Sequence, residues 1–250
     1  MWKNIGLEQC LSFINCQLTP GVQGRSPNLV KPAITVSRMT GAGGFTVASK
    51  LAEFMQAKVP QHVPWTVFDR KLVERVLEDH HLSKRVAEFM PENHKSMLTD
   101  IFEELLGLHP SSWTLVHQTS ETILRLAKLG NVILLGRGAS VVTRRLDSVF
   151  HVRLVGSVAK RIERVQQVYK LDRPTATTFV KRGDKGRRHY LKEHFHEDID
   201  DPLLYHLIIN TDRICYDAAA RLIGDEVIRR FQLDRPEAAV ESWQSRVGLH

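Results

Sequence analysis

The chain reads ITVSRMTGAGGFTVA over residues 34–48, and this stretch predicts the architecture of the protein. A β-branched run stops at a glycine-rich turn, and apolar residues at helical spacing follow from Val47 to Met55. A strand, a glycine turn and a helix start together make an anion site, because backbone N–H groups converge there and the helix dipole adds positive charge. The stretch is therefore a candidate phosphate-binding loop.

The loop nearly keeps the spacing of the common phosphate-loop pattern but lacks its lysine. That pattern, G-x-x-x-x-G-K-[ST], has a lysine directly after its second glycine. Gly44 stands at the lysine position here, and Thr46 follows two residues later. Because similar turns serve packing alone in many α/β proteins, the loop by itself leaves phosphate binding and packing equally open.

The composition is that of an ordinary globular protein. The chain has 250 residues, of which 42% are hydrophobic and 25% charged, enough for one large α/β domain with or without appendages. No apolar run approaches the roughly 18 residues of a membrane helix, and no secretory signal pattern is visible. Three scattered cysteines (Cys10, Cys16 and Cys215) predict neither a disulfide framework nor a zinc site. We expect a cytoplasmic protein without a membrane partner.

The positive charge is concentrated in one segment. Residues 161–192 hold ten basic and three acidic residues, a net charge of +7 that equals the excess of the whole chain. Such a concentration predicts a polyanionic partner, either a phosphorylated small molecule or a nucleic acid. Only Phe179 and Tyr190 supply aromatic rings between Pro174 and Lys192, which disfavours stacking on nucleic-acid bases.

Five apolar runs alternate with helical patterns along the chain. We expect strands at residues 34–37, 65–68, 150–155 and 206–210 and within 131–138, and helices from the loop to about 57, at about 111–129, at 158–169, from 174 through the basic segment, and at about 216–231. This alternation predicts an α/β fold with a doubly wound parallel sheet. Ligands bind such sheets at the carboxyl ends of the strands. The residues that follow those ends are Arg38–Gly44, Asp69, Arg70, Arg137, Thr211 and Asp212.

The chain divides into three parts. Residues 1–31 read as an N-terminal appendage with a short helix and a linker, and residues 233–250 as a tail. Residues 32–232 form the main domain, with a helical insertion at about 83–129 and a basic lid region at about 161–192. The appendage is expected to pack on the domain or on a second copy in a homodimer, and a regulatory role is the alternative.

Six motifs follow one another at residues 34–44, 68–70, 135–138, 161–164, 184–187 and 207–211. In this order they resemble the cytidylate kinase-like group of P-loop nucleoside monophosphate kinases. The resemblance implies a three-layer α/β/α P-loop NTPase fold with a five-stranded parallel sheet, a helical lid and a nucleoside-monophosphate-binding insertion. It implies phosphoryl transfer from ATP, with Mg²⁺, to a pyrimidine nucleoside monophosphate such as CMP or dCMP.

The resemblance also implies roles for individual residues. The loop that holds the ATP phosphates is implied to comprise Gly41, Ala42, Gly43, Gly44, Phe45 and Thr46, with the Thr46 hydroxyl reaching Mg²⁺. The residues implied to bind the acceptor are Asp69, Arg137, Asp184 and Arg187. The arginines implied to neutralise the transferring phosphoryl group are Arg38, Arg161, Arg164 and Arg182.

Two departures from the kinase pattern keep other functions open. Cytidylate kinases have lysine where Gly44 stands and aspartate where Gly138 stands. Arg38, at the end of the first strand, is the candidate substitute for the lysine. The alternatives are a catalytically weak or silent nucleotide sensor and, less favoured, a nucleic-acid-binding protein that uses the basic helix. Each arginine alone also fits a surface charge, and Asp69 also fits a helix cap.

Overall fold

The computed structural model describes residues 31–59, 63–69 and 113–234. The expected N-terminal appendage, the first part of the helical insertion and nearly all of the C-terminal tail lie outside these ranges. Within them, no helix is both long enough and apolar enough to cross a membrane.

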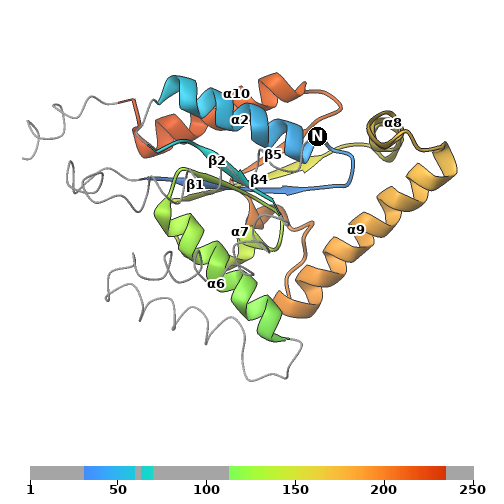
Figure 1. The fold of residues 1–250 in the computed structure, drawn as a ribbon, viewed down its shortest axis with the longest axis horizontal. Coiled ribbons are helices and arrows are strands. Elements are labelled where there is room, and N and C mark those ends of the chain that lie inside the picture. Colours follow the sequence, from blue (N-terminus) through green and yellow to red (C-terminus); the bar gives the residue numbers. More distant parts are fainter. Residues whose placement is uncertain (1–30, 60–62, 70–112, 235–250) are drawn as a thin grey trace, which may run out of the picture.

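A five-stranded, all-parallel sheet forms the centre of the fold (Figure 1). Its order is β2-β3-β1-β4-β5, so β1 lies in the middle and pairs with β3 on one side and β4 on the other. All five expected strands are present, and the α/β prediction is confirmed. Their bounds are β1 Ala33–Arg38, β2 Thr66–Phe68, β3 Val132–Leu135, β4 Val149–Val155 and β5 Leu207–Asn210.

Helices cover both faces of the sheet. In Figure 1, α2 (Gly44–Lys58) and α10 (Tyr216–Phe231) lie on one face, and α6 (Trp113–Leu129) and the short α7 (Ala139–Val142) lie on the other. The helices α8 (Val158–Tyr169) and α9 (Arg173–Phe195) extend beyond the carboxyl end of β1, and the 3-10 turn η1 (Pro202–Leu204) precedes β5. The basic segment, residues 161–192, is therefore next to the edge where parallel sheets bind ligands.

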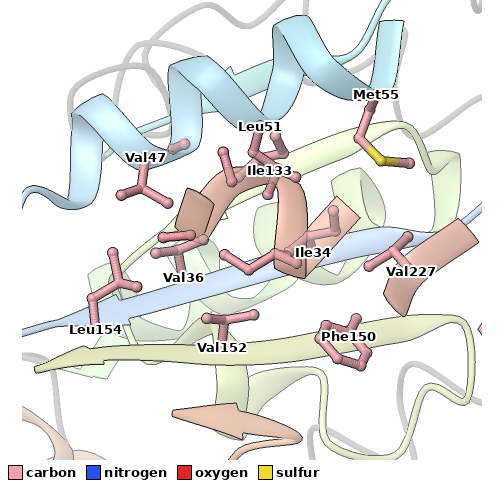
Figure 2. Close-up of a cluster of buried hydrophobic side chains, with 14 of the residues drawn as sticks. Ile34, Val36, Val47, Leu51, Met55, Ile133, Phe150, Val152, Leu154 and Val227 are labelled. Carbon is pink, nitrogen blue, oxygen red and sulfur yellow. The ribbon is translucent and has the colours of Figure 1, made fainter. Parts of the chain in front are cut away.

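Alternation along β1 gives the two faces different chemistry. Ile34 and Val36 are fully buried in the cluster between the sheet, α2 and α10 (Figure 2). Thr35 and Ser37 point to the opposite face, where the Thr35 hydroxyl lies 2.8 Å from Nδ1 of His151. One strand thus contributes apolar side chains to the core and hydroxyl groups to the other side.

Local capping explains why α8 and α9 begin where the sequence predicts. Ser157 accepts a hydrogen bond from the amide of Lys160 at the start of α8. Asp172 accepts one from the amide of Thr175 at the start of α9, where Pro174 fits the first turn. The short helix α7 and the turn η1 were not predicted, because three or four residues carry no readable period.

Candidate active site

The turn between β1 and α2 has the backbone of an anion-binding loop. Gly41 and Gly43 both adopt left-handed conformations, with φ of 81° and 80°. Gly43 is the N-cap of α2, so the amides of the first turn, at residues 44–46, have no partner within the helix. A Cβ atom at Gly43 would collide with the ring of Tyr216. The turn therefore presents backbone amides without helical partners at a helix N-terminus, and this arrangement suits a phosphate.

The basic segment attaches to this loop through Thr40. The Thr40 amide donates to Oδ1 of Asp184 at 2.7 Å, and the Thr40 hydroxyl donates to the same oxygen at 2.8 Å. Arg161, which is only 5% exposed, donates through Nη1 to the Thr40 carbonyl at 2.9 Å and to Oδ2 of Asp184 at 2.6 Å. Arg187 also contacts both Asp184, at 3.1 Å, and Thr40. α8 and α9 are thus pinned to the start of the loop.

These bonds keep Asp184 charged. Burial alone would raise the pKa of Asp184, but the hydrogen bonds from Thr40 and Arg161 and the Arg161 charge together hold that pKa below its ordinary value. The carboxylate is 16% exposed. Asp184 therefore works as an anchor between the helices and the loop.

Arg164 contacts the other end of the loop. Its Nη2 donates to the Thr46 hydroxyl at 2.9 Å, and its guanidinium lies 4.0 Å from the centre of the Tyr216 ring. Arg161 and Arg164 are three residues apart on α8, so one helix face reaches both ends of the turn. The loop is bracketed by two guanidinium groups.

A cavity of about 560 Å³ opens beside the loop, between the ends of β1 and β3 and one face of α9. Four arginines line it, and no carboxylate is found among the described residues of its wall. Hydroxyl groups of β1 form part of the floor, and aromatic rings come from α9. The lining residues that matter here are Arg38, Arg137, Arg182, Arg187, Thr35, Ser37, Thr40, Phe179 and Tyr190.

Arg137 projects from a strained turn after β3. Its φ is 56°, between Gly136 and Gly138, which are also left-handed. For a residue with a Cβ this conformation costs about 1–2 kcal/mol. The guanidinium carbon of Arg137 lies 5.8 Å from the centre of the Tyr190 ring on α9. Strain at a cavity-lining residue is typical of functional sites.

Arg38 is a partly buried cation among other cations. Its pKa is lowered to about 10 by burial first and then by the charge of Arg187, while Asp69 opposes the shift and Arg137 adds to it. Arg38 remains charged at neutral pH. In the described part of the chain, no carboxylate comes within 4 Å of its guanidinium. An anionic ligand would relieve this crowding of positive charge.

The residues around Thr46 fit Mg²⁺ only as an ion carried by nucleotide phosphates. Mg²⁺ in phosphoryl-transfer sites is usually held by one or two carboxylates together with substrate phosphates. The described residues contain no cluster of three His, Cys, Asp or Glu side chains that could hold a metal, and the Thr46 hydroxyl faces the Arg164 cation. The Thr46 hydroxyl is the one side-chain oxygen of residues 41–46 that could bind Mg²⁺, through the lone pair that Arg164 does not use.

The structure separates the sequence-predicted residues into two groups. The cavity brings together Arg38, Arg137, Arg182 and Arg187, and Asp69 lies close enough to act on Arg38. Arg161, Arg164 and Asp184 contact the loop and are not among the lining residues. Of the loop residues, Phe45 is 55% exposed, and the rest are buried or partly buried.

Several lining residues were missed by the sequence analysis. The hydroxyls of Thr35 and Ser37 alternate with apolar residues in a buried strand, which was a readable signal. On α9, Gly183 and Gly186 precede Tyr190 at helical spacing. A Cβ at Gly183 would lie 2.5 Å from the Thr40 hydroxyl, so this glycine permits the close approach of α9 to the loop.

The fold and the loop together define an α/β protein of the P-loop kinase class. The chain belongs to the cytidylate kinase-like family, whose model matches residues 33–213. A search of curated protein sequences found no significant match.

One solved structure supports the fold, and two others show a weaker likeness. An uncharacterized protein from Eubacterium ventriosum ATCC 27560 superposes with a TM-score of 0.61 at 19% identity, covering 80% of this chain and 99% of that one. Shikimate kinase from Acinetobacter baumannii in complex with shikimate gives a TM-score of 0.42 at 18% identity, covering 80% and 95%. A gluconokinase from Sinorhizobium meliloti 1021 gives 0.42 at 14% identity, covering 82% and 94%.

Proposed function

We propose that this protein is a nucleoside monophosphate kinase-like phosphotransferase that uses ATP and a pyrimidine nucleoside monophosphate such as CMP or dCMP. In the reaction, the bond between the γ-phosphorus of ATP and its bridging oxygen breaks. An oxygen of the acceptor phosphate forms the new bond to that phosphorus, which gives ADP and a nucleoside diphosphate. Mg²⁺ bound to the nucleotide would neutralise charge on the phosphates.

One observation carries the proposal: the arginine-lined cavity begins where the loop begins. Thr40, which directly precedes Gly41, lines the cavity, and so does Arg38 two residues earlier. A donor phosphate on the loop amides and an acceptor in the cavity would therefore be neighbours. Loose phosphoryl transition states need positioning and neutralisation of charge more than a protein base.

The cavity wall suits an anionic, aromatic acceptor. Arg137 and Arg187 offer planar guanidinium groups, which bind phosphate oxygens in pairs. Phe179 and Tyr190 offer rings on which a pyrimidine can stack. The volume of about 560 Å³ is within the usual range of small-ligand sites.

Several arginines of the basic segment form hydrogen bonds within the protein, and this favours a small phosphorylated ligand over nucleic acid. Arg161, Arg164 and Arg187 contact the loop or Asp184, and Arg188 pairs with Asp200 at 2.8 Å. Nucleic-acid binding by α9 would instead weaken steeply with salt and ignore added ATP. A silent sensor would bind ATP or CMP and release no ADP.

A coupled assay of ADP release tests the proposal. Purified protein with Mg²⁺ and ATP is assayed with CMP, dCMP, UMP and AMP, and we expect CMP or dCMP to stimulate ADP formation. Nucleotide binding without ADP formation with any acceptor would favour the sensor, and loss of oligonucleotide binding at moderate salt would identify the nucleic-acid alternative.

A variant at Arg137 tests the acceptor site. Arg137→Gly removes the guanidinium and relieves the left-handed strain, so the fold should be kept while the KM for the acceptor rises about 10²-fold, the effect of losing paired charge-assisted hydrogen bonds. Arg144→Ala, on the surface beside Glu197, is the control and should leave KM unchanged. An unchanged KM for Arg137→Gly would remove Arg137 from the acceptor site.

A further inference from the structure

The Arg38 side chain lies over the position that the missing lysine would occupy. A Cβ atom built on Gly44 would lie 2.8 Å from Cγ of Arg38 and 3.2 Å from its Cδ. Contacts under 3.0 Å to the middle of a side chain cannot be relieved without moving that side chain. Because the Arg38 side chain crosses position 44, glycine fits there without displacing it and a residue with a Cβ atom does not.

The far end of the same side chain crosses a second glycine. A Cβ atom on Gly136, at the end of β3, would collide with Nη1 of Arg38. Arg38 thus runs from the first turn of α2 to the edge of the cavity, above β1 and β3. Its guanidinium end therefore lies beside Gly136, at a cavity whose wall includes Arg38 itself.

We propose that Arg38 and Gly44 form an exchanged pair relative to the G-x-x-x-x-G-K pattern. Arg38 stands at the first glycine position of that pattern and supplies the cation, while a glycine, Gly44, stands at the lysine position. The inference rests on the proposed function, because it assigns the charge that contacts the phosphoryl group during transfer. Residues 38 and 44 are the first and last positions of the G-x-x-x-x-G-K pattern, so R38G/G44K would restore that pattern over residues 38–44.

The chemistry of the two side chains supports the exchange. Arginine offers a rigid fork that can hold two oxygens of one phosphoryl group, whereas lysine offers a point charge on a flexible stem. Burial and the charges of Arg187 and Arg137 lower the pKa of Arg38, and the charge of Asp69 opposes this shift. A fixed cation at this place needs little reorganisation when charge moves from donor to acceptor.

Four variants test the pair through the rate of ADP formation and the Kd values of ATP and ADP. Arg38→Ala should lose about 10²- to 10³-fold in kcat, as with loss of one oriented donor, and should bind ATP no better than ADP. Gly44→Ala should also lose activity, because its Cβ displaces Arg38, although alanine suits a helix start at least as well as glycine. Gly44→Lys alone should be impaired for the same steric reason.

The double variant R38G/G44K provides the decisive comparison. It removes the crossing side chain and supplies the lysine, so it should be at least tenfold faster than either Arg38→Ala or Gly44→Lys. Arg229→Ala, a surface arginine paired with Glu226 on α10, is the matched control and should keep wild-type rates. Thermal unfolding of each variant checks that the fold is kept.

The outcomes separate this inference from the proposed function. An active wild type with Arg38→Ala within about threefold of its rate would overturn the inference alone, and so would a double variant no faster than Arg38→Ala. A wild type that forms no ADP with any acceptor would overturn the proposed function and, with it, the inference.

Discussion

The two faces of the central sheet differ in what they bury. Under α2 and α10 the contacts are apolar, and Leu51, Met55 and Val227 are completely inaccessible (Figure 2). On the other face an apolar core under α6 and α7 gives way, toward the carboxyl ends of the strands, to buried polar groups and the cavity. One face therefore stabilises the fold, whereas the other combines packing with a cavity.

The polar groups of the second face form a connected network. Arg153 on β4 is 4% exposed and donates to Ser37 at 2.8 Å and to Asp200 at 2.5 Å. Its guanidinium carbon also lies 5.5 Å from the centre of the Tyr205 ring. Buried charge is retained here because it is paired, which fixes the floor of the cavity at the end of β1.

The largest effect is expected on the apolar face. Leu51→Ala deletes a fully buried side chain between α2 and the sheet, and should lower the free energy of unfolding by about 2–5 kcal/mol. Leu203→Ala is the control, because Leu203 is 90% exposed, and should change it by about 0.5 kcal/mol or less. Urea unfolding measures both, and equal effects would contradict the assignment of α2 to the main core.

A smaller effect on the second face depends on pH. His151 is buried beside Thr35, and burial, then the charges of His206 and Arg230, lower its pKa from 6.5 to about 4. Between those values the unfolded chain binds a proton that the folded chain does not, so stability falls as pH falls through this window. The shift of about 2.5 pKa units corresponds to roughly 3 kcal/mol at most.

Urea unfolding from pH 8 to pH 4.5 measures this dependence. His151→Gln should remove most of the dependence of the unfolding free energy on pH. A small part of this dependence should remain because burial also lowers the pKa of His206. Wild-type stability that stays flat from pH 6.5 to 4.5 would show that His151 is not buried as a neutral ring. Leu51→Ala should retain the wild-type slope, because its cavity lies on the other face.

The sequence predicted the fold better than the cavity, and particular residues show why. The five strands, α8 and α10 follow from apolar periodicity and local caps such as Ser157, which are properties of neighbouring residues. Arg38 and Arg137 could be singled out because they follow strand ends in a parallel sheet. The role of Tyr190 could not, because it depends on how α9 docks across β1, which no local pattern specifies.

The position of Gly44 shows the same limit. From sequence, the glycine reads as a missing lysine. In the structure it is the space through which Arg38 passes. Only the direction of the Arg38 side chain, a tertiary property, distinguishes a lost group from an exchanged one.

The smallest of these effects is expected at the attachment of α9 to the loop. Asp184→Asn keeps the shape of the side chain but removes the charge that accepts from Thr40, Arg161 and Arg187. Charge-assisted hydrogen bonds contribute about 1.5–3 kcal/mol, but the guanidinium groups regain some hydration, so we expect a loss of about 1 kcal/mol in unfolding free energy.

Hydrogen exchange sharpens this prediction, because the Thr40 amide donates directly to Asp184. That amide should exchange at least tenfold faster in Asp184→Asn, while amides in the middle of α2, on the apolar face, should keep wild-type rates. Asp225→Asn on α10 is the matched control and should leave Thr40 protected. If Thr40 stays protected in Asp184→Asn, the carboxylate charge is not what holds α9 to the loop, and the second face would depend on apolar packing as much as the first.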